Sequence, residues 1–345
     1  NLHRRGFSDE AIERNGYRSI SADFPWVNRY WKAKEQYQKL IPSIRKDNIL
    51  KRRTPERLIA GLIAASILAK CGCELRGVPG FFRIDGVWCF NLEPGMLIPT
   101  RNAVGQIVAL QVRRDKPSDW NDYCKRTGQN KEFLRYMTIS AKGLPDGVTT
   151  DISQAHFPLG NDSLDDPETA VCITEGPLKA DAAVELKGNR KMFFIALHGT
   201  SNTKTLPAIF AWLKGKGVET VFNVFDMDKV TNVNVAKAGK RVRAIAAGYG
   251  IKLAEKCWDA EYAQRKLSEL NAICCEHGIF VPTTFNVFTD LANVSQELAK
   301  RNIRHSRVKN ADGLEEKHYW SDKTKGIDDY LLPIRTATGG EGASA

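Results

Sequence analysis

The most constraining feature of this 345-residue sequence is that acidic residues directly follow apolar runs. Glu175 comes after the run 171–174, and Asp226 and Asp228 come after the run 221–225. Apolar runs that alternate with helix-like stretches are typical of a parallel sheet with crossover helices. Because ligands of open α/β sheets bind at the carboxyl ends of the strands, these acids are expected to meet at one site.

A weaker signal is the pair Asp328 and Asp329, which follows a third short segment, 325–327. Converging carboxylates cannot all stay ionised without a cation, and carboxylate oxygens suit Mg²⁺ or Mn²⁺. Asp226 and Asp228 lie on one side of an extended segment, where they can share one or two metal ions that coordinate phosphate oxygens. The alternative is that these are ordinary turn and helix-start acids, favoured there by capping and by the helix dipole.

The charge of the chain indicates a polyanionic partner. There are 51 basic and 40 acidic residues, a net charge of +11, and nucleic acid is the commonest polyanion. A generally basic enzyme is the alternative. The longest apolar run, Leu58 to Ala69, has the length of a core helix. We therefore expect a cytoplasmic protein without a membrane partner. Zinc is not expected either, because the cysteines form no C-x-x-C pair.

The pattern of the chain predicts several regions. Helices are expected at 9–16, after a Ser8 cap, at 31–40, and at 57–70, after a Thr54 cap. Strands are then expected at 96–99, 107–112 and 133–139, with a hairpin connection at 102–105. In the second half, the expected strands are 171–174, 192–197 and 219–225, and the expected helices are 178–187, 204–214 and 233–247. The predicted division is 1–76 (helical and basic), 77–165 (strand-rich), 166–335 (α/β, with an insertion near 259–318) and 336–345 (a disordered tail or linker).

These motifs resemble a known family. The segment Glu175–Pro177 (EGP), the loop Leu197–Ser201 (LHGTS), the D-x-D at Asp226 and the segment Lys325–Tyr330 (KGIDDY) look like a Toprim domain, which bacterial primases, topoisomerases and some nucleases share. The preceding strands are similar to the basal domain of bacterial-type primases, with the segments Gly95–Arg101 (GMLIPTR), Gly105–Arg113 (GQIVALQVR) and Leu134–Ser140 (LRYMTIS). The segment Gly6–Ile12 (GFSDEAI) is similar to primase-like proteins of plasmids, phages and integrated elements.

The resemblance implies an α/β protein in which a mixed α+β basal domain precedes a Toprim domain with a central parallel sheet flanked by helices. It implies a DNA primase that makes short primers on a single-stranded DNA template from nucleoside triphosphates, with a replicative helicase as a further partner. Glu175, Asp226 and Asp228 would be catalytic and hold Mg²⁺ or Mn²⁺, and Asp328 or Asp329 would complete the acidic site. Arg101, Arg113 and Arg135 would contact the triphosphate or the nucleic-acid backbone; each is otherwise a surface charge.

One departure from the family pattern is Lys179, which stands where replicative primases carry an acid, so that the next acid is Asp181. Either the ammonium of Lys179 replaces part of the charge of a second metal ion and contacts a nucleotide phosphate, or it forms an ion pair with Glu175 or a neighbouring acid. A Toprim nuclease is one alternative function, since the same acids would act with water as the nucleophile. A non-catalytic nucleic-acid-binding protein is the other, and Lys179 is the residue that favours it.

Overall fold

The computed structural model describes residues 2–20, 30–114, 134–150, 154–303, 307–309, 315–317 and 324–338. The chain divides into two compact units. The parallel-sheet unit consists of residues 1–12, 102–105 and 153–345, and the antiparallel unit consists of residues 13–101 and 106–152. Each unit is described by itself.

The antiparallel unit contains a four-stranded sheet in the order β1-β4-β5-β6. Its strands are β1 (Arg18–Ile20), β4 (Gly95–Arg101), β5 (Ile107–Arg113) and β6 (Tyr136–Thr138). Strands β4 and β5 pair in antiparallel fashion, as the predicted hairpin requires, and the turn between them is closed by a hydrogen bond from Gly105 N to Asn102 O at 3.0 Å. The predicted strand 133–139 is shorter in the structure, and its first residue lies outside the described residues.

Two helices and a small hairpin complete the antiparallel unit. They are α2 (Trp31–Lys46), α3 (Pro55–Lys70), β2 (Phe81–Ile84) and β3 (Val87–Phe90), with a short 3-10 helix, η3 (Leu50–Arg52). The Thr54 hydroxyl accepts a hydrogen bond from Arg57 N at 3.4 Å, which confirms the predicted cap of α3. Leu58 and Leu62 of α3 pack with Phe82 in one apolar cluster, so the longest apolar run of the sequence is a core helix, as predicted.

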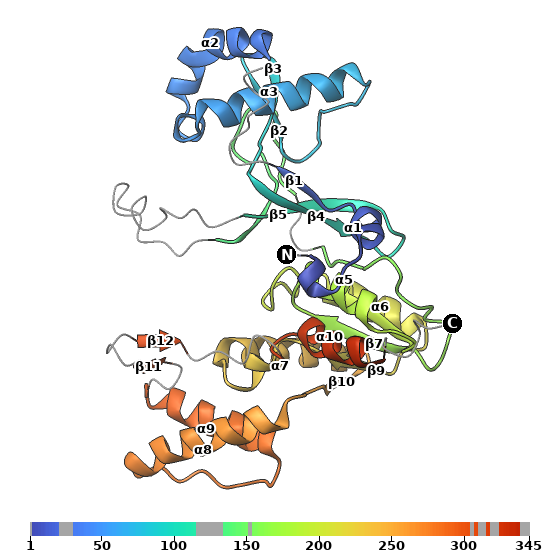
Figure 1. Ribbon diagram of the computed structural model, residues 1–345, viewed down its shortest axis with the longest axis vertical. Helices are drawn as coiled ribbons and strands as arrows, with labels where there is room; N and C mark the ends of the chain where they lie inside the picture. Colours follow the sequence, from blue (N-terminus) through green and yellow to red (C-terminus); the bar gives the residue numbers. More distant parts are fainter. Residues whose placement is uncertain are drawn as a thin grey trace. The chain divides into compact units, whose positions relative to one another are not determined.

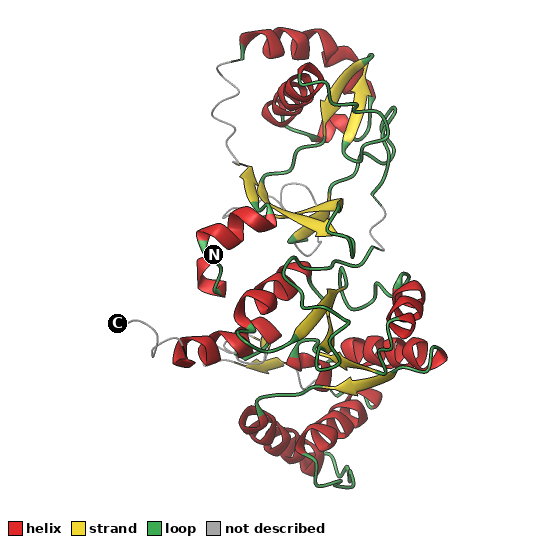
Figure 2. Ribbon diagram, turned by 90° about the vertical axis from the view of Figure 1, so that its right-hand side faces the viewer, coloured by secondary structure: helices red, strands yellow, loops and turns green. Residues whose placement is uncertain are grey.

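The parallel-sheet unit is built on four strands in the order β10-β9-β7-β8, all with parallel neighbours (Figures 1 and 2). The strands are β7 (Ala170–Thr174), β8 (Met192–Ala196), β9 (Thr220–Asn223) and β10 (Lys252–Glu255). The flanking helices are α5 (Pro177–Leu186), α6 (Leu206–Gly215), α7 (Val233–Gly248) and α10 (Ile327–Thr338). This arrangement confirms the predicted parallel sheet flanked by helices.

The side chains of β7 show how the two faces of this sheet are covered. Cys172 points into a cluster that contains residues of α5 and α10, and Val171 and Ile173 point into a cluster that contains residues of α6 and α7. Strand order reverses between β7 and β9, because the chain leaves β7 in one direction to β8 and later returns past β7 to β9. Ligands bind at such a switch point in open α/β sheets.

The remaining described elements are η1 (His3–Arg5), α1 (Asp9–Asn15), η4 (Met227–Val230), α8 (Ala260–Glu276), α9 (Val287–Lys300), β11 (Arg307–Lys309) and β12 (Glu315–Lys317). Helices α8 and α9 pack side by side in the region that the sequence pattern did not resolve (Figure 1). The Ser8 hydroxyl accepts a hydrogen bond from Ala11 N at 3.2 Å, as predicted for the cap of α1. Helix α10 continues to Thr338, and the rest of the predicted tail lies outside the described residues.

One predicted strand is too long. The run 219–225 was expected to be extended throughout, but β9 ends at Asn223. The Asn223 side chain accepts a hydrogen bond from Phe225 N at 3.1 Å, which turns the chain. Val224 and Phe225 are buried although they lie outside the strand, so their apolar side chains indicate that the segment is buried and not that it is extended. In the described ranges, no helix is both long enough and apolar enough to cross a membrane.

A glycine in α3 provides a test of packing in the antiparallel unit. A Cβ on Gly61 would overlap the carbonyl oxygen of Phe90 and lie 2.8 Å from Cys89 Sγ. We expect Gly61→Ala to lower the free energy of unfolding by about 1–3 kcal/mol, the usual cost of overpacking. Chemical denaturation would measure this, with Ser66→Ala, an exposed position of the same helix, as the control. An unchanged stability of Gly61→Ala would show that α3 and β3 do not pack as described.

Candidate active site

The two central strands of the parallel sheet each end in an acid. Glu175 directly follows β7, and Asp226 follows β9 after a two-residue turn. Because β7 and β9 are paired neighbours, the two carboxylates come together at the point where strand order reverses. The Asp226 N–H donates a hydrogen bond to Glu175 Oε2 at 3.1 Å. The predicted meeting of these acids therefore occurs, and both side chains are largely buried.

Lys179 lies between these two carboxylates. Helix α5 begins at Pro177, so Lys179 is in its first turn and its side chain can reach back to the sheet edge. Its Nζ donates a hydrogen bond to Glu175 Oε1 at 2.5 Å and another to Asp226 Oδ1. Of the two alternatives for Lys179, the ion pair is the contact that the structure contains.

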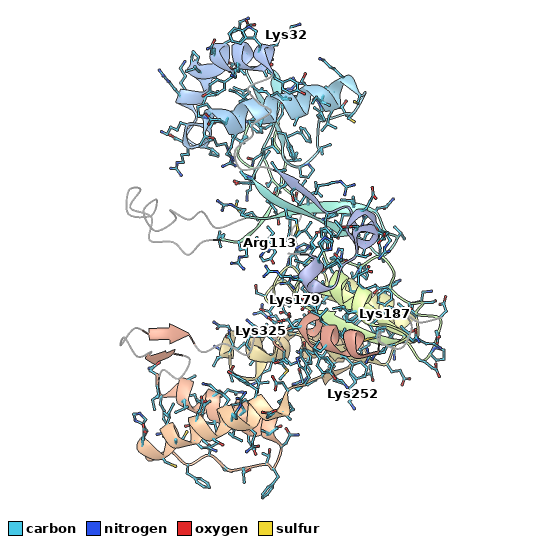
Figure 3. The ribbon with its side chains drawn as sticks, viewed as in Figure 1. Lys32, Arg113, Lys179, Lys187, Lys252 and Lys325 are labelled. Carbon is cyan, nitrogen blue, oxygen red and sulfur yellow. The ribbon has the colours of Figure 1, made fainter. Side chains whose placement is uncertain are left out.

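A second lysine contacts the D-x-D pair. Lys325 Nζ lies 3.4 Å from Asp228 Oδ2 and 3.7 Å from Asp226 Oδ2. The backbone of this lysine is held in place as well, because its carbonyl oxygen accepts a hydrogen bond from Met227 N at 2.9 Å. Figure 3 shows Lys179 and Lys325 in the same part of the parallel-sheet unit. The charge of Lys325 at this site was not anticipated from the sequence, although the residue belongs to the KGIDDY motif.

The two acids at the start of α10, Asp328 and Asp329, have different contacts. Asp328 is 2% exposed, and its Oδ2 forms an ion pair with Arg5 of η1, whereas its buried Oδ1 has no hydrogen-bond partner in the described part of the chain. Asp329 Oδ2 accepts a hydrogen bond from Gly326 N at 3.0 Å, which is capping chemistry at the start of the helix. No local signal in the sequence pointed to Arg5, since it pairs with a residue 323 positions away.

Burial dominates the electrostatics of this site. It raises the pKa of Glu175 to about 7, with Lys179 opposing the shift and Asp226 adding to it. It also raises the pKa of Asp328 to about 6 against the opposing effect of Arg5. Burial alone would raise the pKa of Asp226 too, but the Lys179 charge and the hydrogen bonds with Glu175 and Lys179 give a net lowering. The carboxylates are thus expensive to ionise wherever no cation is close.

The fit of a divalent ion to this site is partial. In the residues that the structure describes, no three His, Cys, Asp or Glu side chains are already arranged as ligands of one metal ion. The donor atoms are nevertheless carboxylate oxygens, which suit Mg²⁺ or Mn²⁺. A Cβ on Gly326 would lie 2.5 Å from Asp328 Oδ1, 3.1 Å from Asp329 Oδ2 and 3.3 Å from Asp226 Oδ1. Three carboxylate oxygens, one of them the orphaned buried Oδ1 of Asp328, therefore lie near the open side of Gly326, and these are the donors that would hold one ion.

The three arginines predicted to bind phosphate belong to the antiparallel unit. Arg101 is in β4, and its Nη2 donates a hydrogen bond to Asn15 O at 3.4 Å. Arg113 is half-buried at the end of β5, and Arg135 is exposed just before β6. The carbonyl oxygen of Arg135 accepts a hydrogen bond from Arg114 N at 2.7 Å, so the backbone of Arg135 is attached to the end of β5. Arg101 and Arg113 lie in the sheet, in β4 and β5, and Arg135 lies next to it, just before β6.

Asp181, the next acid after Glu175, does not join the acidic site. Its Oδ1 is hydrogen-bonded to His156 Nε2 at 2.8 Å, and both side chains are almost fully buried. Residue His156 forms a two-way backbone bridge with Ala196 at the end of β8. The histidine and aspartate thus anchor α5 to the segment that crosses β8, a structural role that the sequence did not reveal.

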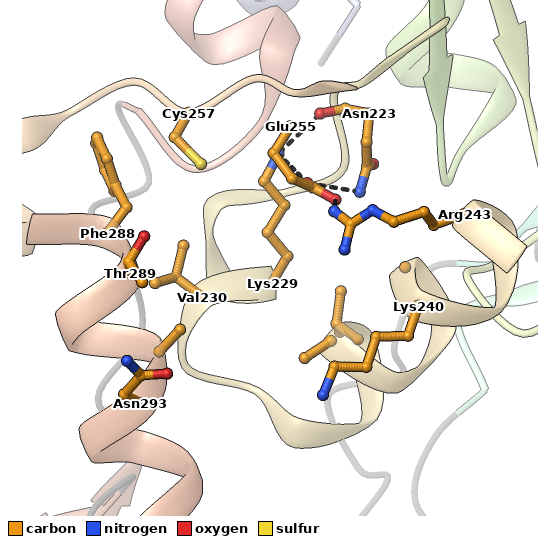
Figure 4. A pocket seen from close by; sticks show the side chains of 14 residues that line it. Asn223, Lys229, Val230, Lys240, Arg243, Glu255, Cys257, Phe288, Thr289 and Asn293 are labelled. Atoms are coloured by element: carbon orange, nitrogen blue, oxygen red, sulfur yellow. Dashed lines mark hydrogen bonds and ion pairs between the residues drawn. The ribbon is translucent and has the colours of Figure 1, made fainter. Parts of the chain in front are cut away.

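A cavity of about 290 Å³ lies near the carboxyl ends of β9 and β10 (Figure 4). Its walls come from η4, α7 and α9, and it includes the buried Lys229. Lys229 Nζ donates hydrogen bonds to Asn223 O at 2.9 Å and to Lys256 O at 2.6 Å, and Glu255 pairs with Arg243 at 2.6 Å. Because these groups satisfy one another, the acidic edge is the stronger candidate for a site that does chemistry.

No protein-family model matches this sequence, and no curated protein matches it. Solved structures do match. The Aquifex aeolicus primase (zinc-binding and RNA polymerase domains) is 12% identical with a TM-score of 0.40, and the match covers 88% of this chain and 54% of that one. A DNA primase domain from Pseudomonas aeruginosa is 14% identical with a TM-score of 0.39, over 88% of this chain and 91% of that one. A DnaG primase catalytic domain bound to ssDNA is 16% identical with a TM-score of 0.37, over 74% and 63%.

The chain thus spans about half the length of the Aquifex aeolicus protein. The chains named above are bacterial-type primase cores, and this protein is similar to them. At identities of 12–16%, residue roles do not transfer, so the roles proposed below are argued from the contacts in this chain.

His198, in the LHGTS loop, provides a pH test of the site region. Burial, followed by the nearby His156, lowers its pKa from 6.5 to about 4. Between pH 6.5 and about 4, His198 is therefore protonated in the unfolded chain but neutral in the folded chain. The free energy of unfolding falls as the pH decreases through this range. We expect this loss to be about 2 kcal/mol, less than the full shift implies because the ring is partly exposed.

Urea denaturation at pH 7 and at pH 4.5 would measure the effect in the wild type and in His198→Asn. Buried carboxylates such as Asp328 titrate in the same range with the opposite sign, but they are common to both proteins. The difference in stability between the two proteins should therefore shift in favour of His198→Asn at the lower pH. A difference that does not change with pH would mean that His198 is exposed to solvent.

Proposed function

We propose that this chain is a primase-like nucleotidyltransferase that makes short primers on single-stranded DNA during replication of a plasmid, phage or integrated element. The observation that carries this proposal is the acidic edge, where Glu175, Asp226, Asp228 and Asp328 lie together at the switch point of the parallel sheet. Clustered carboxylates that can hold a divalent cation suit phosphoryl transfer, in which the protein mainly positions the reactants and balances charge.

In this proposal, Glu175, Asp226 and Asp228 are the catalytic acids. The Mg²⁺ or Mn²⁺ that they hold with Asp328 or Asp329 would activate the primer 3′ hydroxyl and stabilise charge on the reacting phosphate. Lys179 donates two N–H groups to carboxylates, which leaves its third N–H for a phosphate oxygen.

The antiparallel unit would supply the contacts to nucleic acid. Arg101, Arg113 and Arg135 are proposed to bind the triphosphate or the backbone of the template and primer, as their charge and their position in or next to one sheet support. The partners are then single-stranded DNA, nucleoside triphosphates and a replicative helicase.

A second candidate function is non-catalytic binding of nucleic acid. The observation that favours it is that Lys179 and Lys325 already neutralise part of the acidic edge. Incubation with labelled nucleotides, single-stranded DNA and Mg²⁺ or Mn²⁺ separates the possibilities. New short oligonucleotides support a primase, cleavage of the template supports a Toprim nuclease, and retention of DNA without either reaction supports a binding protein.

Asp228→Asn tests the catalytic role of the D-x-D pair. The substitution removes charge and preserves volume, so we expect primer synthesis to fall roughly a hundredfold or more while the fold is kept. Incorporation of labelled nucleotide and far-ultraviolet circular dichroism would measure the two effects. The control is Asp165→Asn, because Asp165 is an exposed acid that forms an ion pair with Lys216 and precedes β7 instead of following it. Full activity of Asp228→Asn would remove Asp228 from the catalytic site.

The salt dependence of DNA binding tests the proposed contacts of Arg113. Affinity for single-stranded DNA should fall log-linearly with salt, and each phosphate contact should contribute about 0.7 to the slope. We expect Arg113→Ala to reduce the slope by about that amount. Lys70→Ala, which changes the net charge equally at an exposed position of the same unit, serves as the control. A salt-insensitive affinity would contradict a role in binding nucleic acid.

A further inference from the structure

We propose that the acidic edge binds one divalent cation rather than two, because the ammonium group of Lys179 takes the place of a second ion. This inference rests on the proposed function and narrows the metal site that it needs. Two acids spaced as Asp226 and Asp228 can in general share one or two metal ions. The contacts of Lys179 and Glu175 decide between these possibilities.

Glu175 has both carboxylate oxygens engaged by the protein itself. Oε1 accepts from Lys179 Nζ at 2.5 Å, and Oε2 accepts from Asp226 N at 3.1 Å and from Thr174 Oγ1 at 3.4 Å. A metal ion between Glu175 and Asp226 would have to displace the lysine from both carboxylates. For this single ion, Glu175 therefore orients Lys179 and Asp226 and is not itself a ligand, which narrows the metal ligands of the proposed function to the aspartates.

Lys179 is well held in this position. It is four residues after Glu175 in the first turn of α5, so the two side chains lie on the same face of the chain. The carboxylates of Glu175 and Asp226 keep the pKa of Lys179 above its ordinary value although burial opposes this, and the group remains a cation. A half-buried ammonium with two carboxylate partners is a fixed positive charge at the place where a second ion would sit.

The other side of Asp226 remains suited to a metal. Lys325 is 3.4–3.7 Å from Asp228 and Asp226, beyond the length of a good charge-assisted hydrogen bond. Because its contacts with the carboxylates are longer than those of Lys179, a divalent ion can displace Lys325 from them at lower cost. The open side of Gly326 lies near the orphaned Oδ1 of Asp328 and near Asp226 Oδ1, the oxygen that Lys179 also contacts, whereas Lys325 is on the side of Asp226 Oδ2.

The charge of the site agrees with a single ion. Its acids are Glu175, Asp226, Asp228, Asp328 and Asp329, and its cations are Arg5, Lys179 and Lys325. With all of them ionised, five negative charges against three positive ones leave two negative charges, which one divalent cation neutralises. A second ion would leave the buried site with a net positive charge.

Titration of the full chain with Mn²⁺, followed by the electron paramagnetic resonance of the free ion, tests the proposal without any measurement of activity. We expect one Mn²⁺ per wild-type chain, displaced by excess Mg²⁺, and at least about tenfold weaker binding in Asp228→Asn. We expect Lys179→Gln, which keeps most of the side-chain length, to bind two. Lys187→Ala removes a lysine at the end of the same helix that pairs with Asp162, and it should still bind one.

Two bound ions in the wild type would overturn the proposal, and so would a single ion of unchanged affinity in both Lys179→Gln and Lys179→Ala. Thermal unfolding identifies a variant that has not folded, and the stoichiometry of the wild type then decides alone. One bound ion without primer synthesis would contradict the proposed function and leave this inference standing. Two ions with primer synthesis would do the reverse, and no Mn²⁺ binding would contradict both.

Discussion

The ion pairs of Lys179 with Glu175 and Asp226 are the interaction on which the parallel-sheet unit most depends. Two buried carboxylates stand at the ends of neighbouring strands, and like charges at such a distance repel strongly in a poorly solvated environment. The lysine offsets this repulsion from the first turn of α5. In the proposal above, the same lysine also limits how many divalent cations the edge can accept.

The apolar layers explain why the site is electrostatically costly. Strands β7 and β9 are the central strands, and α5 with α10 on one face and α6 with α7 on the other exclude water from both sides. Acids at the ends of such strands are desolvated, which raises the pKa of Glu175 to about 7. Bare carboxylates are unfavourable there, so a metal ion at this edge, as proposed above, would replace one cation by another.

Sequence patterns predicted the elements that depend on local signals. The caps at Ser8 and Thr54 are confirmed, because a cap needs only residues three positions apart. The predicted end of β9 was wrong. Phe225 is buried outside the strand, and a buried apolar residue looks the same in the sequence whether or not it belongs to a strand. For Lys179 the sequence left an ion pair and a phosphate contact open, because both need the same charge at the same position.

The sequence by itself determined that Glu175 and the D-x-D pair would follow strands of a parallel sheet and thus share an edge, because the alternation of strands and helices sets that direction. Only the tertiary structure decided which cation meets which oxygen. Arg5 pairs with Asp328, which is 323 positions away in the sequence. Lys325, just before α10, comes close to the D-x-D pair because α10 packs against α5. Such pairs depend on how distant elements pack. A charge attracts any opposite charge that packing brings within a few ångströms, so the sequence does not show which partner it will have.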